Sequence, residues 1–281
     1  MGPGFWHHRF PNSARSSIDL AVGAQSLPGP ADNLSFLAFR RAVALGFALA
    51  LCIVRFWILR LRGPLTLEKR ALWVQQTCLG ILKGVGIHYR VEGTPPAHGL
   101  VVANHLSYLD ILIISAVMPC FFVAKVEIGG WPFFGKAARL GGTIFLDRSS
   151  LDSANSVARQ MTERLQEPIP LLLFPEGTST DGNMLRFHSR LIDPATSAGV
   201  PITAAAVRYV IEGGVKEREL CWYDDTLFLT HLLKTLRTPG FSGEVIFGEP
   251  KVYPNRRVAA DETYAEISAM REHGAFAPQK S

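Results

Sequence analysis

A histidine and an aspartate five residues apart are the pair best suited to chemistry in this sequence. His105 and Asp110 lie in VVANHLSYLD, directly after a short apolar run. Imidazole is a natural general base near neutral pH, and a carboxylate that accepts from one ring nitrogen fixes its tautomer. The G-x-S-x-G turn that would carry a serine nucleophile is absent. The pair therefore predicts a base that activates a hydroxyl supplied by the substrate.

The spacing of this pair requires a particular local structure. A helix is expected to begin near Ser107 and to end before Pro119. Five residues do not align on one helix face, so His105 must lie in the preceding loop to reach Asp110. The positive end of the helix dipole would keep the imidazole neutral there. The alternative is a capping loop with a structural histidine, since so short a pattern also arises by chance.

Other polar residues also follow apolar segments. Arg148 follows GGTIFLD, where it could meet an anion, or form an ordinary surface ion pair. Glu176 and Gly177 follow LLLFP, and Gly177 with the hydroxyl of Thr178 would let a loop approach a polar ligand closely. Lys125 precedes a loop rich in glycine and aromatic residues.

Apolar strand-like segments alternate with helical ones from residue 83 onward. Strands are expected at 87–93, 99–104, 120–125, 141–147, 169–174, 200–209 and 244–250, and helices at 107–118, 150–166, 190–199 and 259–273. This alternation predicts an α/β fold with a mostly parallel central sheet flanked by helices, spanning 83–281. Sites in such sheets lie at the carboxyl ends of the strands. The three polar clusters NHLSYLD, FLDRSS and FPEGTST each follow an apolar strand and therefore fall at such ends.

The N-terminal part has a different character. Residues 42–54 carry no polar side chain, and arginines flank the apolar run that continues to residue 59. The run predicts either a short transmembrane helix or a helix lying in the membrane interface, with a buried core helix as the alternative. With the amphipathic segment 65–82 it forms a predicted membrane-associated hairpin at 34–82. Residues 1–33 lack periodicity and are expected to be a disordered tail.

The excess of positive charge is concentrated in the same N-terminal part of the chain. Residues 1–70 hold nine Lys and Arg against three Asp and Glu, whereas the remainder holds 20 against 21. A nearly neutral folded domain argues against nucleic acid as a partner. The four cysteines lie far apart without a CxxC pair, so neither a metal site nor a redox motif is expected.

The ordered blocks NHLSYLD, GGTIFLDR, FPEGTST and GVPI resemble those of the glycerolipid acyltransferases, most closely the bacterial 1-acylglycerol-3-phosphate and related lysophospholipid acyltransferases. The resemblance covers roughly residues 85–250, and the 34–82 hairpin is similar to the family's N-terminal membrane motif. It implies acyl transfer from acyl-CoA or acyl-carrier protein, as co-substrate and without a cofactor, to a lysophospholipid hydroxyl. It also implies attachment, as a monotopic or single-span protein, to the cytoplasmic face of the inner membrane.

The resemblance further implies residue roles. His105 and Asp110 would be catalytic, and Arg148 would contact the acceptor phosphate. The substrate-binding set is completed by Asn104, Lys125, Glu176, Gly177 and Thr178.

The family pattern is not matched everywhere. Ser179 stands where many members have arginine, and Phe187–Arg190 replaces a Phe-Lys-x-Gly segment. The favoured acceptor is 1-acylglycerol-3-phosphate, giving phosphatidate in phospholipid biosynthesis, and a lyso-ornithine lipid or another lysolipid is the alternative. A non-catalytic lipid-surface binding protein is the alternative of another class. A phosphate-binding G-x-x-x-x-G-K-[ST] loop is absent from the sequence.

Overall fold

The computed structural model describes residues 30–131, 133–147, 151–211, 215–238 and 240–273. Its seven-stranded sheet has the order β1-β7-β6-β2-β5-β3-β4, and every neighbouring pair is parallel except β6 with β7. The predicted mostly parallel α/β sheet is confirmed. The strands are β1 His88–Glu92, β2 Leu100–Ala103, β3 Phe121–Lys125, β4 Ile144–Leu146, β5 Leu171–Leu173, β6 Ile202–Ile211 and β7 Phe241–Phe247.

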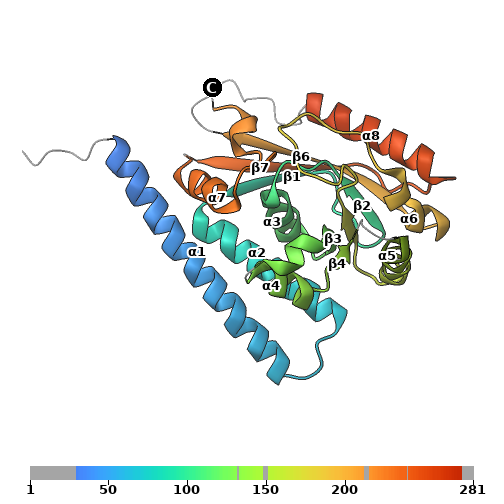
Figure 1. The fold of residues 1–281 in the computed structure, drawn as a ribbon, viewed down its shortest axis with the longest axis horizontal. Helices are drawn as coiled ribbons and strands as arrows, with labels where there is room; N and C mark the ends of the chain where they lie inside the picture. Colours follow the sequence, from blue (N-terminus) through green and yellow to red (C-terminus); the bar gives the residue numbers. More distant parts are fainter. Residues whose placement is uncertain (1–29, 132, 148–150, 212–214, 239, 274–281) are drawn as a thin grey trace, which may run out of the picture.

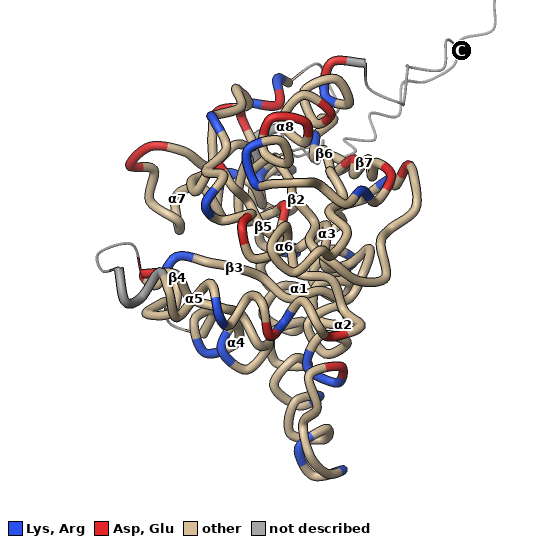
Figure 2. The backbone as a smooth tube through the Cα atoms, turned by 90° about the vertical axis from the view of Figure 1, so that its right-hand side faces the viewer, with Lys and Arg blue, Asp and Glu red and all other residues tan. Residues whose placement is uncertain are grey.

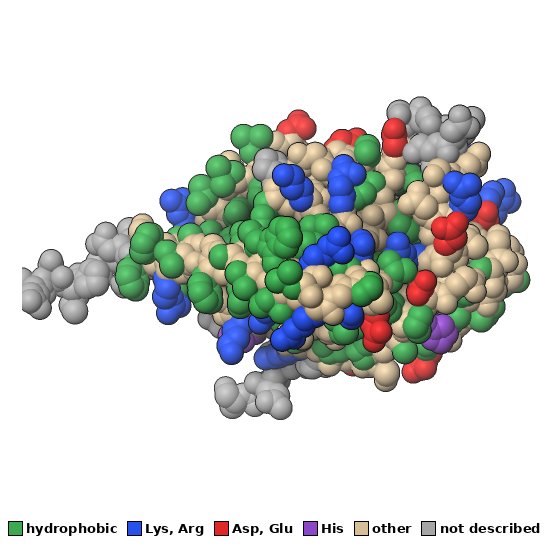
Figure 3. Space-filling model, turned by 90° about the horizontal axis from the view of Figure 1, so that it is seen from below, with side chains coloured by type: hydrophobic (Ala, Val, Ile, Leu, Met, Phe, Trp, Pro, Cys, Tyr) green, Lys and Arg blue, Asp and Glu red, His purple; other side chains and the backbone are tan. Residues whose placement is uncertain are grey.

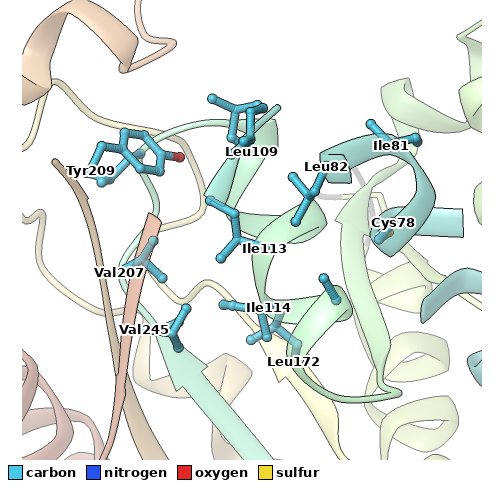
Figure 4. Close-up of a cluster of buried hydrophobic side chains, with 14 of the residues drawn as sticks. Cys78, Ile81, Leu82, Leu109, Ile113, Ile114, Leu172, Val207, Tyr209 and Val245 are labelled. Atoms are coloured by element: carbon cyan, nitrogen blue, oxygen red, sulfur yellow. The ribbon is translucent and has the colours of Figure 1, made fainter. Parts of the chain in front are cut away.

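Helices cover both faces of this sheet (Figure 1). One face carries α3 (Tyr108–Val117) and α2 (Leu67–Val85), and the other carries α5 (Leu151–Arg164), α6 (Asp193–Ser197) and α8 (Arg256–His273). Each face has its own apolar core, because strands buried on both sides are apolar almost throughout. Figure 4 shows the α3 side, where Ile113 and Ile114 pack between α2 and the sheet residues Leu172, Val207 and Val245.

The N-terminal hairpin projects from the domain. Helix α1 (Pro30–Leu61) runs beside α2 and extends well past the sheet (Figure 1). Within its segment Leu34–Leu61, an 18-residue window has a mean hydropathy of 2.3 and only 11% of that window is buried, and no other helix among the described residues is as long and apolar. Lys and Arg recur along the projecting hairpin, with few acidic residues (Figure 2). An apolar helix left uncovered by protein is consistent with the predicted membrane-associated hairpin.

Two helices depart from the expected elements. Helix α4 (Phe134–Gly141) begins in the glycine- and aromatic-rich loop expected between Lys125 and Lys136 and continues beyond it, and α7 (Phe228–Arg237) was not expected. The apolar residues of α7 recur at helical spacing, at Phe228, Leu229, Leu232, Leu233 and Leu236, so periodicity could have predicted this helix. Residues 1–29 of the expected disordered tail lie outside the described part, and α1 begins at Pro30, four residues before the expected start of the hairpin.

The turn before β2 needs a glycine. Gly99 has a φ of +89°, and a Cβ there would lie 2.4 Å from the carbonyl oxygen of Pro201. The Gly99 carbonyl also accepts from the Leu171 amide, so the backbone holds the start of β5 in place. A side chain at position 99 would therefore strain the starts of β2, β5 and β6.

Gly99→Ala should lower the free energy of unfolding by at least about 1–3 kcal/mol, the cost of left-handed backbone strain alone. Gly80→Ala in α2 is the matched control, because its added Cβ meets nothing within 4 Å and alanine favours a helix by up to about 1 kcal/mol. Urea unfolding in detergent micelles measures both. Equal stabilities for the two variants would contradict this account of the turn.

Candidate active site

The carboxyl ends of three adjacent strands meet at one edge of the sheet. In the order β2-β5-β3, these strands are followed by His105, by Phe174–Thr178 and, at the end of β3, by Lys125. The expectation that the polar clusters lie together at this edge is confirmed for the segments that contain His105 and Glu176, and Lys125 lies beside them. Arg148, expected to follow β4 at the same edge, lies outside the described residues.

His105 and Asp110 form the predicted pair. The Nδ1 of His105 lies 2.8 Å from Oδ2 of Asp110, and Ser107 is the N-cap of α3, so His105 sits in the loop before the helix as expected. The Asp110 side chain is fully buried, while that of His105 is 18% exposed. Phe174 stacks on the imidazole with ring centroids 4.1 Å apart and fixes the plane of the ring. Because Asp110 accepts at Nδ1, Nε2 is left as the basic nitrogen.

Asp110 also accepts from three groups besides the histidine. Its Oδ2 accepts from the backbone amides of Leu106 (2.6 Å) and Ser107 (3.0 Å), the latter completing a capping box. Its Oδ1 accepts from the hydroxyl of Tyr209 on β6, which also lies 3.0 Å from the Ser107 hydroxyl. Burial, together with the charge of Asp110, raises the pKa of Tyr209 well above its usual value, so the phenol stays a donor.

Asn104 and Glu176 hold the loops around the pair. The Asn104 amide donates to the Val207 carbonyl (3.1 Å) and accepts from the Val207 amide (2.7 Å), which continues the β2–β6 ladder after β2 turns away. Glu176 accepts from the backbone amides of His105 and Leu185, each at 2.8 Å. Burial raises the pKa of Glu176, while these two donors favour its charged form.

An apolar cavity of about 440 Å³ opens beside His105. The volume falls within the range of small-molecule sites. Its apolar walls come from five α-helices, with Leu45 and Leu49 on α1, Ile81 on α2, Leu112 on α3, Phe134 on α4, and Phe228 and Leu232 on α7. The polar and charged residues on its surface include Lys125, Thr178, Ser179 and Asp224. The site can therefore hold a long apolar group beside a base.

The predicted site residues divide into two groups. Lys125, Gly177 and Thr178 line the same cavity as His105. Asn104 and Glu176 are 1% and 3% exposed, and their side chains form hydrogen bonds with backbone groups. They therefore hold the loops of the site in place and do not line the cavity. Their assignment to substrate binding stays a prediction.

Sequence reasoning missed Tyr209, Phe174 and Asp224. Phe174 lies inside the LLLFPEG block, so its proximity to His105 could have been expected once the strand ends were paired. Tyr209 is 99 residues from Asp110 and has no distinguishing neighbour in the sequence.

The described residues contain no group of three or more His, Cys, Asp or Glu side chains that could hold a metal ion. All four cysteines are buried and free, and burial raises the pKa of the Cys78 and Cys221 thiols to about 12. Thiols with such pKa values are protonated and unreactive at neutral pH.

Comparisons with known proteins agree with this site. Residues 87–208 match the model of the Acyltransferase family. A lyso-ornithine lipid O-acyltransferase of Rhodobacter capsulatus is 36% identical, over 69% of this chain and 72% of its own length. A 1-acyl-sn-glycerol-3-phosphate acyltransferase of Neisseria meningitidis is 37% identical, over 52% and 59%. The crystal structure of the 1-acyl-sn-glycerophosphate acyltransferase from Thermotoga maritima shares the fold, with a TM-score of 0.63 at 19% identity over 87% of this chain and 98% of that one.

A partly exposed histidine oriented by a buried carboxylate beside an apolar cavity fits the O-acyltransferase class to which these relatives belong. The chain belongs to the acyltransferase family that includes lyso-ornithine lipid and 1-acyl-sn-glycerol-3-phosphate acyltransferases. The resemblance seen in the sequence blocks is thereby confirmed.

Tyr209→Phe tests the support of the pair. It leaves Oδ1 of Asp110 buried without its donor, which costs about 1–3 kcal/mol of stability. We expect a lower unfolding temperature and a fall in kcat, with KM little changed, because Tyr209 is buried and does not line the cavity. Tyr264→Phe is the control, since its ring packs on Phe187 on the other face of the sheet. A kcat equal to that of the unmodified protein would show that Tyr209 does not position Asp110.

Proposed function

We propose that the protein attaches to a membrane through α1 and transfers an acyl group from an acyl thioester to the free hydroxyl of a lysolipid. One observation carries the proposal: the His105–Asp110 pair lies on an apolar cavity whose walls include residues of the exposed helix α1. A lipid acceptor and a long acyl chain both need apolar surroundings, and a chain drawn from a bilayer would pass along α1. The acyl donor is acyl-CoA or acyl-carrier protein.

The reaction follows from the orientation of the imidazole. The acceptor hydroxyl passes its proton to Nε2 of His105, while Asp110 stabilises the imidazolium through Nδ1. The hydroxyl oxygen bonds to the thioester carbonyl carbon and forms a tetrahedral intermediate. When this intermediate collapses, the C–S bond breaks and the departing thiolate takes the proton from Nε2. No group of the protein becomes acylated.

A lyso-ornithine lipid is the acceptor we favour over 1-acylglycerol-3-phosphate. Relatives named for the ornithine lipid align over a larger part of the chain, 69% and 74% against 52%. The cavity carries both a cation, Lys125, and an anion, Asp224, whose backbone has a φ of 53°. An ornithine headgroup offers an amino group and a carboxylate to this pair, whereas a phosphate monoester would be repelled by Asp224.

1-Acylglycerol-3-phosphate is the second candidate. The relatives from Neisseria carry that name at 37% and 38% identity, and Lys125 could bind a phosphate. Arg148, which the family resemblance assigns to the acceptor phosphate, stays a prediction.

His105→Ala should lower kcat by about 10²–10⁴-fold, the contribution of a general base. The assay supplies a labelled acyl-CoA or acyl-carrier protein thioester with lyso-ornithine lipid, 1-acylglycerol-3-phosphate and other lysolipids in turn, and measures both thiol release and acylated lipid. His98→Ala is the control, because His98 is exposed at the opposite edge of the sheet. The non-catalytic alternative predicts lipid binding without turnover for the unmodified protein and for both variants.

Asp224→Asn tests the choice of acceptor. Loss of the anion should reduce the ratio of kcat/KM for lyso-ornithine lipid to that for 1-acylglycerol-3-phosphate by about two- to fivefold, the range expected of an exposed ion pair. Asp225→Asn is the matched control, because Asp225 is also exposed but does not line the cavity. An unchanged ratio, or the same change in both variants, would remove the charge argument for the ornithine headgroup.

A further inference from the structure

Helix α7 presents leucines on its outer face. Leu227 is 73% exposed, Leu229 64% and Leu233 42%. On the opposite face His231 and Thr235 are buried, while Leu236 is buried and Phe228 and Leu232 line the cavity at the edge of the exposed leucines. The fold therefore does not need the outer leucines for its core, and their exposure costs free energy unless something covers them.

The charges near these leucines are predominantly basic. Lys234 and Arg237 lie in the last turn, and residues 226–237 contain no Asp or Glu. Lys234 pairs with Glu219 at 2.6 Å, and both side chains are about half exposed, so water competes with this pair. Asp224 and Asp225 precede the helix at its other end. Leucines beside a basic last turn match the composition of helices that lie in the interface of an anionic membrane.

The position of α7 relative to α1 favours a bilayer over a protein as the covering partner. Arg41 of α1 donates to the carbonyls of Leu236 (3.2 Å) and Thr238 (2.6 Å), which ties the end of α7 to the first part of α1. On α1, Phe36 and Phe39 close to this contact are 69% and 66% exposed. Viewed from below, the molecule shows hydrophobic side chains with Lys and Arg among them along α1, and acidic side chains mostly nearer the rim (Figure 3).

We propose that α7 is a second lipid-contacting element, in which Leu227, Leu229 and Leu233 enter the boundary between headgroups and acyl chains, and Lys234 and Arg237 contact anionic headgroups. The bilayer would then lie against the outer face of the helix whose inner face lines the cavity. Each basic residue near an anionic surface adds to the attraction. The proposal concerns the membrane attachment put forward above and does not depend on which lysolipid is the acceptor.

Fluorescence from a single labelled cysteine tests this contact. The native cysteines are all buried, so a cysteine introduced by Leu229→Cys in the full-length protein can be labelled selectively with an environment-sensitive fluorophore. Val252→Cys is the matched control, because Val252 is 63% exposed, close to the 64% of Leu229, and follows the bridge at Lys251 beside the start of β6, the edge opposite the cavity. The vesicles are phosphatidylcholine with or without phosphatidylglycerol, plus a nitroxide-labelled lipid.

The label at 229 should shift to the blue and be quenched by the nitroxide lipid on vesicles with phosphatidylglycerol, whereas the label at 252 should show neither change. Adding Lys234→Gln and Arg237→Gln should reduce the shift at 229 on anionic vesicles only. Vesicle-bound protein with an unquenched label at 229, or with equal quenching at both positions, would overturn the proposal. Because no readout is turnover, these outcomes are separable from failure of the acyltransferase assays.

Discussion

The buried carboxylate of Asp110 is the interaction on which the active site depends. It accepts from the His105 imidazole, from two backbone amides at the start of α3, and from the Tyr209 hydroxyl. A carboxylate removed from water is stable only when its oxygens are satisfied in this way. The same group caps a helix, orients a base and connects β2 to β6. Its position therefore combines local helix chemistry with the long-range packing of the sheet.

The site joins a polar edge to an apolar interior. Strand ends supply the base and Lys125, while α1, α2, α3, α4 and α7 supply the walls of the cavity. An enzyme that acts on a lipid needs both, because the reacting hydroxyl is polar and the rest of the substrate is not. Here the two halves come from different parts of the chain: the hairpin contributes apolar surface, and the sheet contributes chemistry.

Sequence reasoning succeeded where the determinants are local. His105, Ser107 and Asp110 lie within six residues. A capped helix, preceded by a loop that carries the general base, could therefore be inferred from their spacing alone. The strand ends could be placed because buried parallel strands read as short apolar runs. Tyr209 could not be found, since its role depends on β6 pairing with β2 across about a hundred residues. The buried orientation of Asn104 and Glu176 was also inaccessible, because a polar residue at a strand end can face either a ligand or a backbone group.

The distance in sequence between Asp110 and Tyr209 has a consequence for how the protein matures. The histidine and aspartate can meet as soon as the first turn of α3 forms, whereas the phenol arrives only after β6 has docked beside β2. Closing such a long loop is slow compared with forming a helix turn. A partly folded chain would thus hold its base next to a hydrated, mobile carboxylate, and the pair would acquire its final orientation only once the sheet is complete. The final geometry of the pair therefore depends on a contact that forms only when β6 has joined the sheet.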